Sequence, residues 1–215
     1  MTTTTIEIPV RHLLAVAMAA GTEETPYNLA GVHVETVAGH VVLVATNGHI
    51  MLVDGWPSSG ADAQDVNVII PSSALRRLSL LVGKKIPRSL MVTLKINAGD
   101  GATRGSLRLD DASLDFDFID GTYPDWRKVF PTHRECGHVA KLSPVYLRHL
   151  HDAAKLYCGD RLIRNQSVTY GPAFNSPARI TWQACDLVGV IMPIAEPRDC
   201  LPPWVKTIEL MPVSP

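Results

Sequence analysis

The stretch EIPVRHLL, at Glu7–Leu14, joins an apolar strand pattern to a helix pattern through a proline. The same order returns at Ile69–Leu78 (IIPSSALRRL) and at Leu142–Leu150 (LSPVYLRHL). A proline is favoured in the first turn of a helix because its ring fixes φ near the helical value and its missing N–H is not needed there. Strand patterns follow each of these helices, so we interpret the chain as three β-α-β-β-β units.

Each unit is predicted from apolar periodicity and from its turn residues. For the first unit we expect strands and a helix at Thr4–Ile8, Val10–Ala20, Leu29–Thr36, Val41–Thr46 and Ile50–Val53, with a linker at Gly55–Asp65. For the second we expect Val66–Ile70, a helix at Ser72–Val82, Leu90–Asn97, Gly105–Leu109 and Leu114–Ile119. For the third we expect Val139–Leu142, a helix from Pro144 capped by Ser143, Ser167–Tyr170, Ala178–Trp182 and Leu187–Met192.

These patterns predict an α+β protein with antiparallel sheets that carry helices on one face. In the strand Leu114–Ile119, apolar residues alternate with aspartates, which is typical of a sheet with one solvated face. On the helix Ser72–Val82 the apolar face is predicted to hold Leu75, Leu78, Leu81 and Val82. We divide the chain into a domain of two units (1–131), a half domain (132–196) and a C-terminal tail (197–215).

The composition is that of a globular protein with room for a sizeable core. The chain has 215 residues, of which 46% are hydrophobic and 19% are charged. Its apolar runs are too short to cross a bilayer and no signal peptide is recognisable, so we expect a cytoplasmic protein. The four cysteines are scattered without a framework spacing, which favours reduced thiols.

The net charge of −1 conceals a strong segregation of charge along the chain. The stretch Pro71–Arg108 has one acidic residue, Asp100, against eight basic ones: Arg76, Arg77, Lys84, Lys85, Arg88, Lys95, Arg104 and Arg108. The next stretch, Asp110–Asp125, has acidic residues and no basic ones. A positive face could bind a polyanion while the molecule stays near neutral. The alternative is a solvated charged helix beside a charged edge strand.

Three motifs add a family resemblance. VATNGH at Val44–His49, DGTYPDWRKVFP at Asp120–Pro131 and VIMPI at Val190–Ile194 occur in this order. Together they resemble the bacterial DNA polymerase III beta subunit, the replicative sliding clamp, over Thr5–Ala195. The resemblance implies the DNA-clamp fold and a non-enzymatic processivity factor, which encircles duplex DNA and tethers a DNA polymerase. In that family three domains per chain, each of two units, form a ring of two chains.

This chain departs from the family plan. Its first two units resemble the second clamp domain, and the rest resembles only the second half of the third domain, giving about one and a half clamp domains. The ordinary two-chain ring therefore cannot be assumed. A half domain would expose apolar surface and a sheet edge, so we expect a homo-oligomer.

The resemblance also implies a pocket that binds short peptides from polymerases and other partners. Carried over by position, the pocket would be lined by Leu29, Thr46, Gly48, His49, Met51, Pro124, Lys128, Val129, Val190, Ile191, Met192, Pro193 and Ile194. Aliphatic and methionine side chains suit an adaptable apolar groove. Ile50 and Ala195 stand where the family usually has basic residues, so the pocket is less positive. The alternative is that these residues only pack the sheets together.

By the same resemblance, the helices would meet DNA phosphates without reading base sequence. The implied DNA-binding residues are Arg11, Tyr27, Arg76, Arg77, Arg148 and Lys155. Ser72 and Ser73 occupy positions that are often basic in the family, which would weaken the interaction. Each of these basic residues could equally be an ordinary solvated side chain.

The enzymatic alternatives have little support. His133, Cys136 and His138 lie close together, but a second pair at zinc-ligand spacing is missing, and we expect no metal and no cofactor. His49 has no recognisable Ser or Cys nucleophile near it in the sequence, and no phosphate-binding loop motif is present. Two functions remain open: a minimal processivity factor on duplex DNA, or a module without a ring that binds the clamp-binding peptides of replication and repair proteins.

Overall fold

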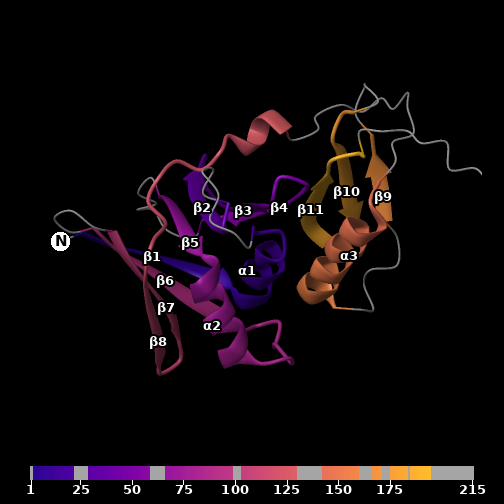
Figure 1. Cartoon of the computed structure of the whole chain (residues 1–215). Coiled ribbons are helices and arrows are strands. Elements are labelled where there is room, and N and C mark those ends of the chain that lie inside the picture. The colour runs from indigo at the N-terminus through magenta and orange to yellow at the C-terminus, as the bar shows by residue number, and fades with distance from the viewer. Residues whose placement is uncertain are drawn as a thin grey trace, which may run out of the picture.

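The computed structural model describes residues 2–21, 29–58, 66–98, 103–129, 142–159, 166–170, 175–183 and 185–194. These residues form two antiparallel sheets and three α-helices, arranged as in Figure 1. The first unit consists of β1 (Thr2–Pro9), α1 (Val10–Ala17), β2 (Gly31–Val37), β3 (His40–Thr46) and β4 (Ile50–Pro57). The second consists of β5 (Asn67–Pro71), α2 (Ser72–Val82), β6 (Met91–Ala98), β7 (Thr103–Leu109) and β8 (Ala112–Asp117). The predicted α+β class is confirmed.

The third unit contains α3 (Pro144–Cys158), β9 (Gln166–Thr169), β10 (Ala178–Trp182) and β11 (Cys185–Ile191). A short 3-10 helix, η1 (Trp126–Val129), lies between the second and third units along the chain. The strand expected at Val139–Leu142 lies outside the described residues, except for Leu142. The C-terminal tail also lies outside them.

The prolines of the three copies do not all have the predicted position. Pro9 and Pro71 each end a strand and stand at the N-cap, one residue before α1 and α2 begin. Only Pro144 is the first residue of its helix, with Ser143 at the N-cap as expected, although the serine side chain makes no capping hydrogen bond. A proline closes a strand as readily as it opens a helix, since both uses dispense with its N–H.

The first two units are interlocked by an exchange of their first strands. The four-stranded sheet has the order β1-β6-β7-β8, so β1 of the first unit lies in the sheet of the second. In return, β5 of the second unit pairs with β2 of the first. The two pairings have the same register, because Pro9 lies opposite Met91 and Pro71 opposite Gly31.

The third unit extends the sheet of the first unit. Strands β4 and β11 pair antiparallel, which gives one seven-stranded sheet of order β5-β2-β3-β4-β11-β10-β9. Helix α1 contacts both α2 and α3, so the three helices form one layer with α1 in the middle. Leu13, Leu78 and Leu150, one from each helix, are fully buried in the core beneath this layer.

A buried polar cluster adds to the contact between the first and third units. The Asp54 side chain on β4 is only 1% exposed and accepts a hydrogen bond from His12 Nδ1 on α1 at 2.9 Å. Tyr157 on α3 donates its hydroxyl to the other oxygen of Asp54 at 3.0 Å and stacks on His12 with ring centroids 3.9 Å apart. The cluster therefore connects α1, β4 and α3.

Some predicted boundaries and faces are wrong. Helix α1 ends at Ala17 instead of Ala20, and residues 18–20 form turns. Strand β4 runs to Pro57, into the stretch expected to be a linker. Leu81 is exposed, whereas Ala74 is buried with Leu75 and Leu78 on α2. Among the described residues, no helix combines the length and the apolar character needed to span a membrane.

Candidate functional site

The seven-stranded sheet has a second apolar surface on the face away from the helices. Its buried residues form a separate cluster, composed of Val44, Met51, Val53, Ile69, Tyr123 and Val190. Successive side chains of a strand point to opposite faces, so Met51 and Val190 face this cluster while their neighbours Ile50 and Ile191 belong to the helix-side core. Because the sheet has apolar residues on both faces, each face must be covered by other parts of the molecule to keep these residues away from water.

The turn between β3 and β4 is fixed by its own side chains. Asn47 Oδ1 accepts the backbone N–H groups of His49 and Ile50, each at 3.0 Å, and Gly48 has a φ of 85° that favours glycine. The Thr46 hydroxyl donates to the Ile50 carbonyl at 2.7 Å and accepts from the Gly48 N–H at 3.1 Å. The TNGH motif thus encodes a rigid turn at the rim of the apolar surface.

The third unit reaches this turn through β11. Val190 lies opposite Met51 in the β4–β11 ladder, and Met192 donates its backbone N–H to the His49 carbonyl at 2.9 Å. The His49 ring also stacks on Tyr146 of α3, with ring centroids 5.2 Å apart. Two motifs that are distant in the sequence therefore form one continuous surface.

The remaining wall comes from the segment after β8, residues 119–129, which we call the strap. The strap starts beside β5, where the Ile119 N–H donates to the Ile69 carbonyl at 3.0 Å. It continues through Tyr123 and Pro124 to η1. In Figure 1 this segment connects β8 to η1 across the side of the molecule that holds β2 and β5.

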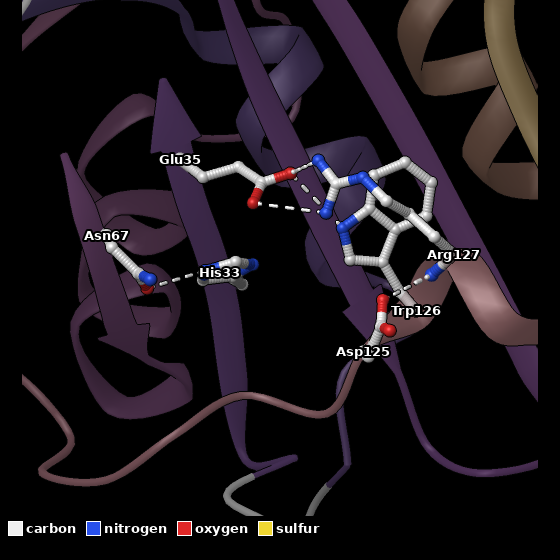
Figure 2. Close-up of polar contacts among 6 residues, drawn as sticks. All are labelled: His33, Glu35, Asn67, Asp125, Trp126 and Arg127. Carbon is white, nitrogen blue, oxygen red and sulfur yellow. Dashed lines mark hydrogen bonds and ion pairs between the residues drawn. The ribbon is translucent and has the colours of Figure 1, made fainter. Parts of the chain in front are cut away.

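A polar clasp attaches the strap to β2 (Figure 2). The Glu35 carboxylate accepts hydrogen bonds from both terminal nitrogens of Arg127, one of them at 3.4 Å, and from Trp126 Nε1 at 3.2 Å. Arg127 lies 4.4 Å above the Trp126 ring, and its backbone N–H donates to Asp125 Oδ1 at 3.3 Å. A bidentate Arg–carboxylate pair with a largely buried Glu35 is more rigid than an ordinary surface pair.

A stacked aromatic pair also holds the strap against β2. His33 on β2 stacks on Tyr123, with ring centroids 4.7 Å apart and planes 12° apart. His33 Nε2 donates to Asn67 Oδ1 at 2.9 Å, and Nδ1 is buried without a hydrogen-bond partner. Burial lowers the pKa of His33, against the opposing effects of Asn67 and Glu35. Burial also raises the pKa of Tyr123, so both rings are neutral near pH 7.

These elements enclose a cavity of about 280 Å³. Its lining is formed by Leu29, Thr46, Gly48, His49, Ile50, Met51, Tyr123, Pro124, Asp125, Trp126, Val129, Val190 and Met192. Val129 and Met192 at the rim are partly exposed apolar side chains. An apolar cavity with an apolar rim and a few polar groups is the usual form of a ligand or peptide site.

The structure brings nine of the thirteen predicted pocket residues together around the cavity, and the other four lie off its lining. Ile191 is fully buried in the helix-side core, because it alternates with Val190 and Met192. Lys128 is solvated beside Asp125, with 3.7 Å between Nζ and Oδ2. Pro193 and Ile194 follow the end of β11 and do not line the cavity.

Several residues of the site were missed by the sequence reasoning. Tyr123 and Trp126 belong to the quoted motif of the strap, so their position in it could have suggested a role. The sequence did not indicate a role for Glu35, because an acidic side chain on a strand is usually solvated. Its function in the clasp depends on a contact across more than 90 residues of sequence.

Five of the six predicted DNA-binding residues lie on the helices, but their surroundings differ. Arg76 and Arg77 are exposed on α2, where Arg77 also donates to the Asp115 carbonyl at 3.1 Å. Arg148 on α3 is exposed, and its Nε lies 3.9 Å from Oδ2 of Asp152 on the same helix. Lys155 is exposed on the same helix.

Two of the predicted DNA contacts need separate comment. Arg11 is partly buried, and its Nε donates to the Ile86 carbonyl at 2.7 Å, which makes it a structural connection from α1 to the loop after α2. Tyr27 lies outside the described residues, as do His133, Cys136 and His138. Within the described part of the chain, no group of His, Cys, Asp or Glu residues could hold a metal ion.

Comparison with known structures identifies the fold as that of the DNA clamps. The DNA polymerase sliding clamp of Pseudomonas aeruginosa superposes with a TM-score of 0.69 and 15% identity, over 89% of this chain and 66% of that clamp. The beta subunit of Streptococcus pyogenes gives a TM-score of 0.68 and 16% identity, over 90% and 66%. At such identities the likeness establishes the fold, and the predicted DNA-clamp fold is confirmed.

Sequence comparison establishes the family. Residues 9–125 match the central domain of the DNA polymerase III beta subunit. The beta sliding clamp of Synechocystis sp. is 31% identical over 124 residues, which are 53% of this chain and 30% of that protein. The chain therefore belongs to the DNA polymerase III beta subunit family, and it spans less than two thirds of the length of these relatives.

Proposed function

We propose that this protein is a clamp-type tether, which holds short apolar segments of replication proteins in the cavity between the strap, β4 and β11. The observation that carries the proposal is the cavity itself. Its lining comes from four separate parts of the chain, namely Leu29 and residues 46–51, 123–129 and 190–192, and each part is held by hydrogen bonds. A preformed apolar site avoids the ordering cost that a mobile groove would incur on binding.

The chemistry of the cavity indicates its ligand. Leu29, Met51 and Val190 offer an apolar floor, and Met192 can adapt to different apolar side chains. The backbone and side-chain polar groups of the Thr46–His49 turn lie at the rim, where they can orient a peptide main chain. An extended peptide with apolar residues in its C-terminal half fits this arrangement.

The test is titration of a labelled clamp-binding peptide from a bacterial DNA polymerase. We expect a micromolar Kd, which corresponds to about −8 kcal/mol. Met192→Ala removes a packed anchor and should weaken binding by about fivefold or more. The matched control is Met18→Ala, because Met18 is 39% exposed, close to the 37% of Met192, but lies at the end of α1.

Three outcomes would contradict the proposal. One is a folded wild-type protein that does not bind the peptide. Another is binding that Met192→Ala leaves unchanged. The third is an equal loss with Met18→Ala, since this would show a nonspecific effect of removing exposed methionines.

A second function, binding to duplex DNA, is favoured by the charge on the helix layer. Helix α2 carries Arg76 and Arg77 and no acidic residue, and the exposed residues Lys84 and Lys85 follow it. Charges of this kind bind phosphates irrespective of base sequence. The protein would then combine a nonspecific DNA contact with the peptide site, as a processivity factor requires.

The DNA proposal is tested by the salt dependence of binding. Replacing Arg76 and Arg77 with Ala should weaken binding to all duplexes alike and reduce the salt slope by up to about two. The control replaces Arg104 and Arg108, which are exposed on β7 in the four-stranded sheet and not on the helices. Equal losses from both double variants, or no DNA binding by the wild type, would contradict a DNA-binding helix layer.

A further inference from the structure

The strap is attached to the cavity in a different way from the walls on β4 and β11. Those two walls belong to paired strands, so the main chain of the sheet fixes them. The strap lines the cavity with Tyr123 and Trp126 among its residues, and side chains of β2 hold both. His33 stacks on Tyr123, and Glu35 accepts the hydrogen bond of Trp126 Nε1 at 3.2 Å. The position of this wall therefore depends on side chains behind it.

Strand β2 itself lies behind the strap. Within the described part of the chain, the cavity lining includes no residue of β2. His33 and Glu35 are two residues apart, so both side chains point to the face of the sheet that the strap covers, whereas Val32 and Val34 belong to the helix-side core. These two side chains of β2 can therefore act on a bound ligand through the strap and not by contact.

Glu35 is the centre of these contacts (Figure 2). Its Oε1 accepts hydrogen bonds from Trp126 Nε1 and from one terminal nitrogen of Arg127, and its Oε2 accepts from the other nitrogen at 3.4 Å. The Glu35 side chain is 13% exposed, against 48% for Arg127. Arg127 in turn lies 4.4 Å above the Trp126 ring. One carboxylate thus holds both the N–H edge of the indole and the guanidinium that covers one of its faces.

We propose that Glu35 is the positioning residue of the peptide site, because its carboxylate sets the orientation of Trp126 on the cavity wall. The inference rests on the proposed function, since it assigns the residue that prepares the same cavity for a peptide. Without the carboxylate, the indole N–H and the Arg127 guanidinium lose the acceptor that they share. Side chains that must be ordered when a ligand binds reduce its affinity. The affinity for the peptide therefore depends on a residue that the peptide does not touch.

The first test is titration of the labelled clamp-binding peptide against variants of the full chain. Glu35→Ala should weaken binding by about tenfold, since two side chains lose their order. Glu35→Gln keeps an oxygen that can accept the Trp126 N–H, so its loss should be only about threefold. Glu7→Ala is the matched control, because Glu7 is an acid on β1, in the other sheet, and also accepts a side-chain hydrogen bond. It should bind like the wild type.

The second test follows Trp126 itself and needs no peptide. The chain has four tryptophans, whose isotope-labelled indole N–H groups give separate NMR signals, and Trp126→Phe identifies the signal of Trp126. In Glu35→Ala this signal should shift and exchange faster with water, while the others stay unchanged. Glu35→Gln should lie between the wild type and Glu35→Ala. A role in stability alone would lower the urea midpoint and leave the peptide Kd of the folded protein unchanged.

The outcomes separate this inference from the proposed function. A folded wild type that binds no peptide would overturn both. If the wild type binds, equal affinity of Glu35→Ala, or an equal loss with Glu7→Ala, would overturn the role of Glu35 alone. A weaker Glu35→Ala with an unchanged Trp126 signal would also overturn it, because the effect would not pass through the indole. If Glu35→Ala does not fold, Glu35→Gln decides, and an unchanged Kd in that variant would refute the proposal.

Discussion

The two junctions of this protein are built differently. The first and second units share two exchanged strand pairs, β1 with β6 and β5 with β2, in two separate sheets. The first and third units share one strand pair, β4 with β11, together with the contact between α1 and α3. The Asp54 cluster supplies the buried polar contact of this second junction.

This difference predicts unequal cooperativity. Separating the first two units would break strand pairing in both sheets, so they should unfold together. Separating the third unit would break one strand pair and expose one helix face, so it should open at lower free energy. The candidate peptide site lies across the weaker junction, since Met51 is on β4 and Val190 is on β11. Peptide binding would then also hold the third unit in place.

The largest expected effect is that of Asp54→Ala. The substitution removes the buried acceptor that the partly buried His12 and Tyr157 share, which should cost about 3 kcal/mol. The loss should be concentrated in the third unit. Hydrogen exchange followed by mass spectrometry should show β10 and β11 losing protection while β1 and β6 keep it. Equal loss of protection in all four strands would contradict the weaker second junction.

Gly31→Ala tests the stronger junction in the same way. A Cβ on Gly31 would lie 2.4 Å from the Ile70 carbonyl oxygen, so the exchanged strand β5 would have to move away from β2. We expect a destabilisation of about 2 kcal/mol in urea unfolding, shared by both of the interlocked units. Gly55→Ala on β4 is the control, because its Cβ would make only ordinary contacts, the nearest at 3.4 Å. Comparable destabilisation by both substitutions would show that the close approach is not the cause.

Tyr157→Phe is a milder change at the second junction. It removes one hydrogen bond to Asp54 but keeps the ring that stacks on His12, so the expected cost is about 1 kcal/mol. Tyr146→Phe makes the same chemical change on the same helix, where the ring stacks on His49 instead. If the two variants have the same unfolding midpoint, the hydrogen bond from the Tyr157 hydroxyl to Asp54 makes no measurable contribution to stability.

The fold was predictable because its main signals are local. Alternation and helical periodicity predicted most elements, and for the helix Ser72–Val82 both ends agree with the structure. The exchange of β1 and β5 was not predictable, because strand patterns carry no information about which unit supplies the neighbour. The position of the third unit also depended on long-range pairing, between β4 and β11.

The residues of the candidate site also fall into those that local motifs predicted and those that depend on tertiary contacts. Residues in recognisable motifs, such as Thr46 and Met192, were proposed for the pocket, and the structure places them on its lining. Ile191 shows the limit of reasoning by motif, because a residue within VIMPI points to the opposite face of the sheet. Glu35 and the buried pair of His33 and Tyr123 required knowledge of tertiary contacts.

The smallest expected effect concerns pH and affects only the first junction. His33 lies on β2 and donates to Asn67 on the exchanged strand β5. Burial lowers the pKa of His33 from its ordinary value of 6.5, so below that pH the unfolded chain binds a proton that the folded chain does not. The stability that depends on the neutral ring is therefore fully present above about pH 6.5 and decreases as the pH falls below it.

The comparison of wild type with His33→Phe isolates this contribution. Phenylalanine keeps a ring against Tyr123 but does not titrate, so the variant should lose less stability than the wild type between pH 7.5 and 5.5. The loss of the Asn67 hydrogen bond lowers the stability of the variant at every pH, so the slope is the informative quantity. The measurement is the urea midpoint at each pH, and the other histidines cancel in the difference. Parallel slopes would mean that His33 remains able to bind a proton in the folded protein, and that the contact between β2 and β5 does not depend on its neutral form.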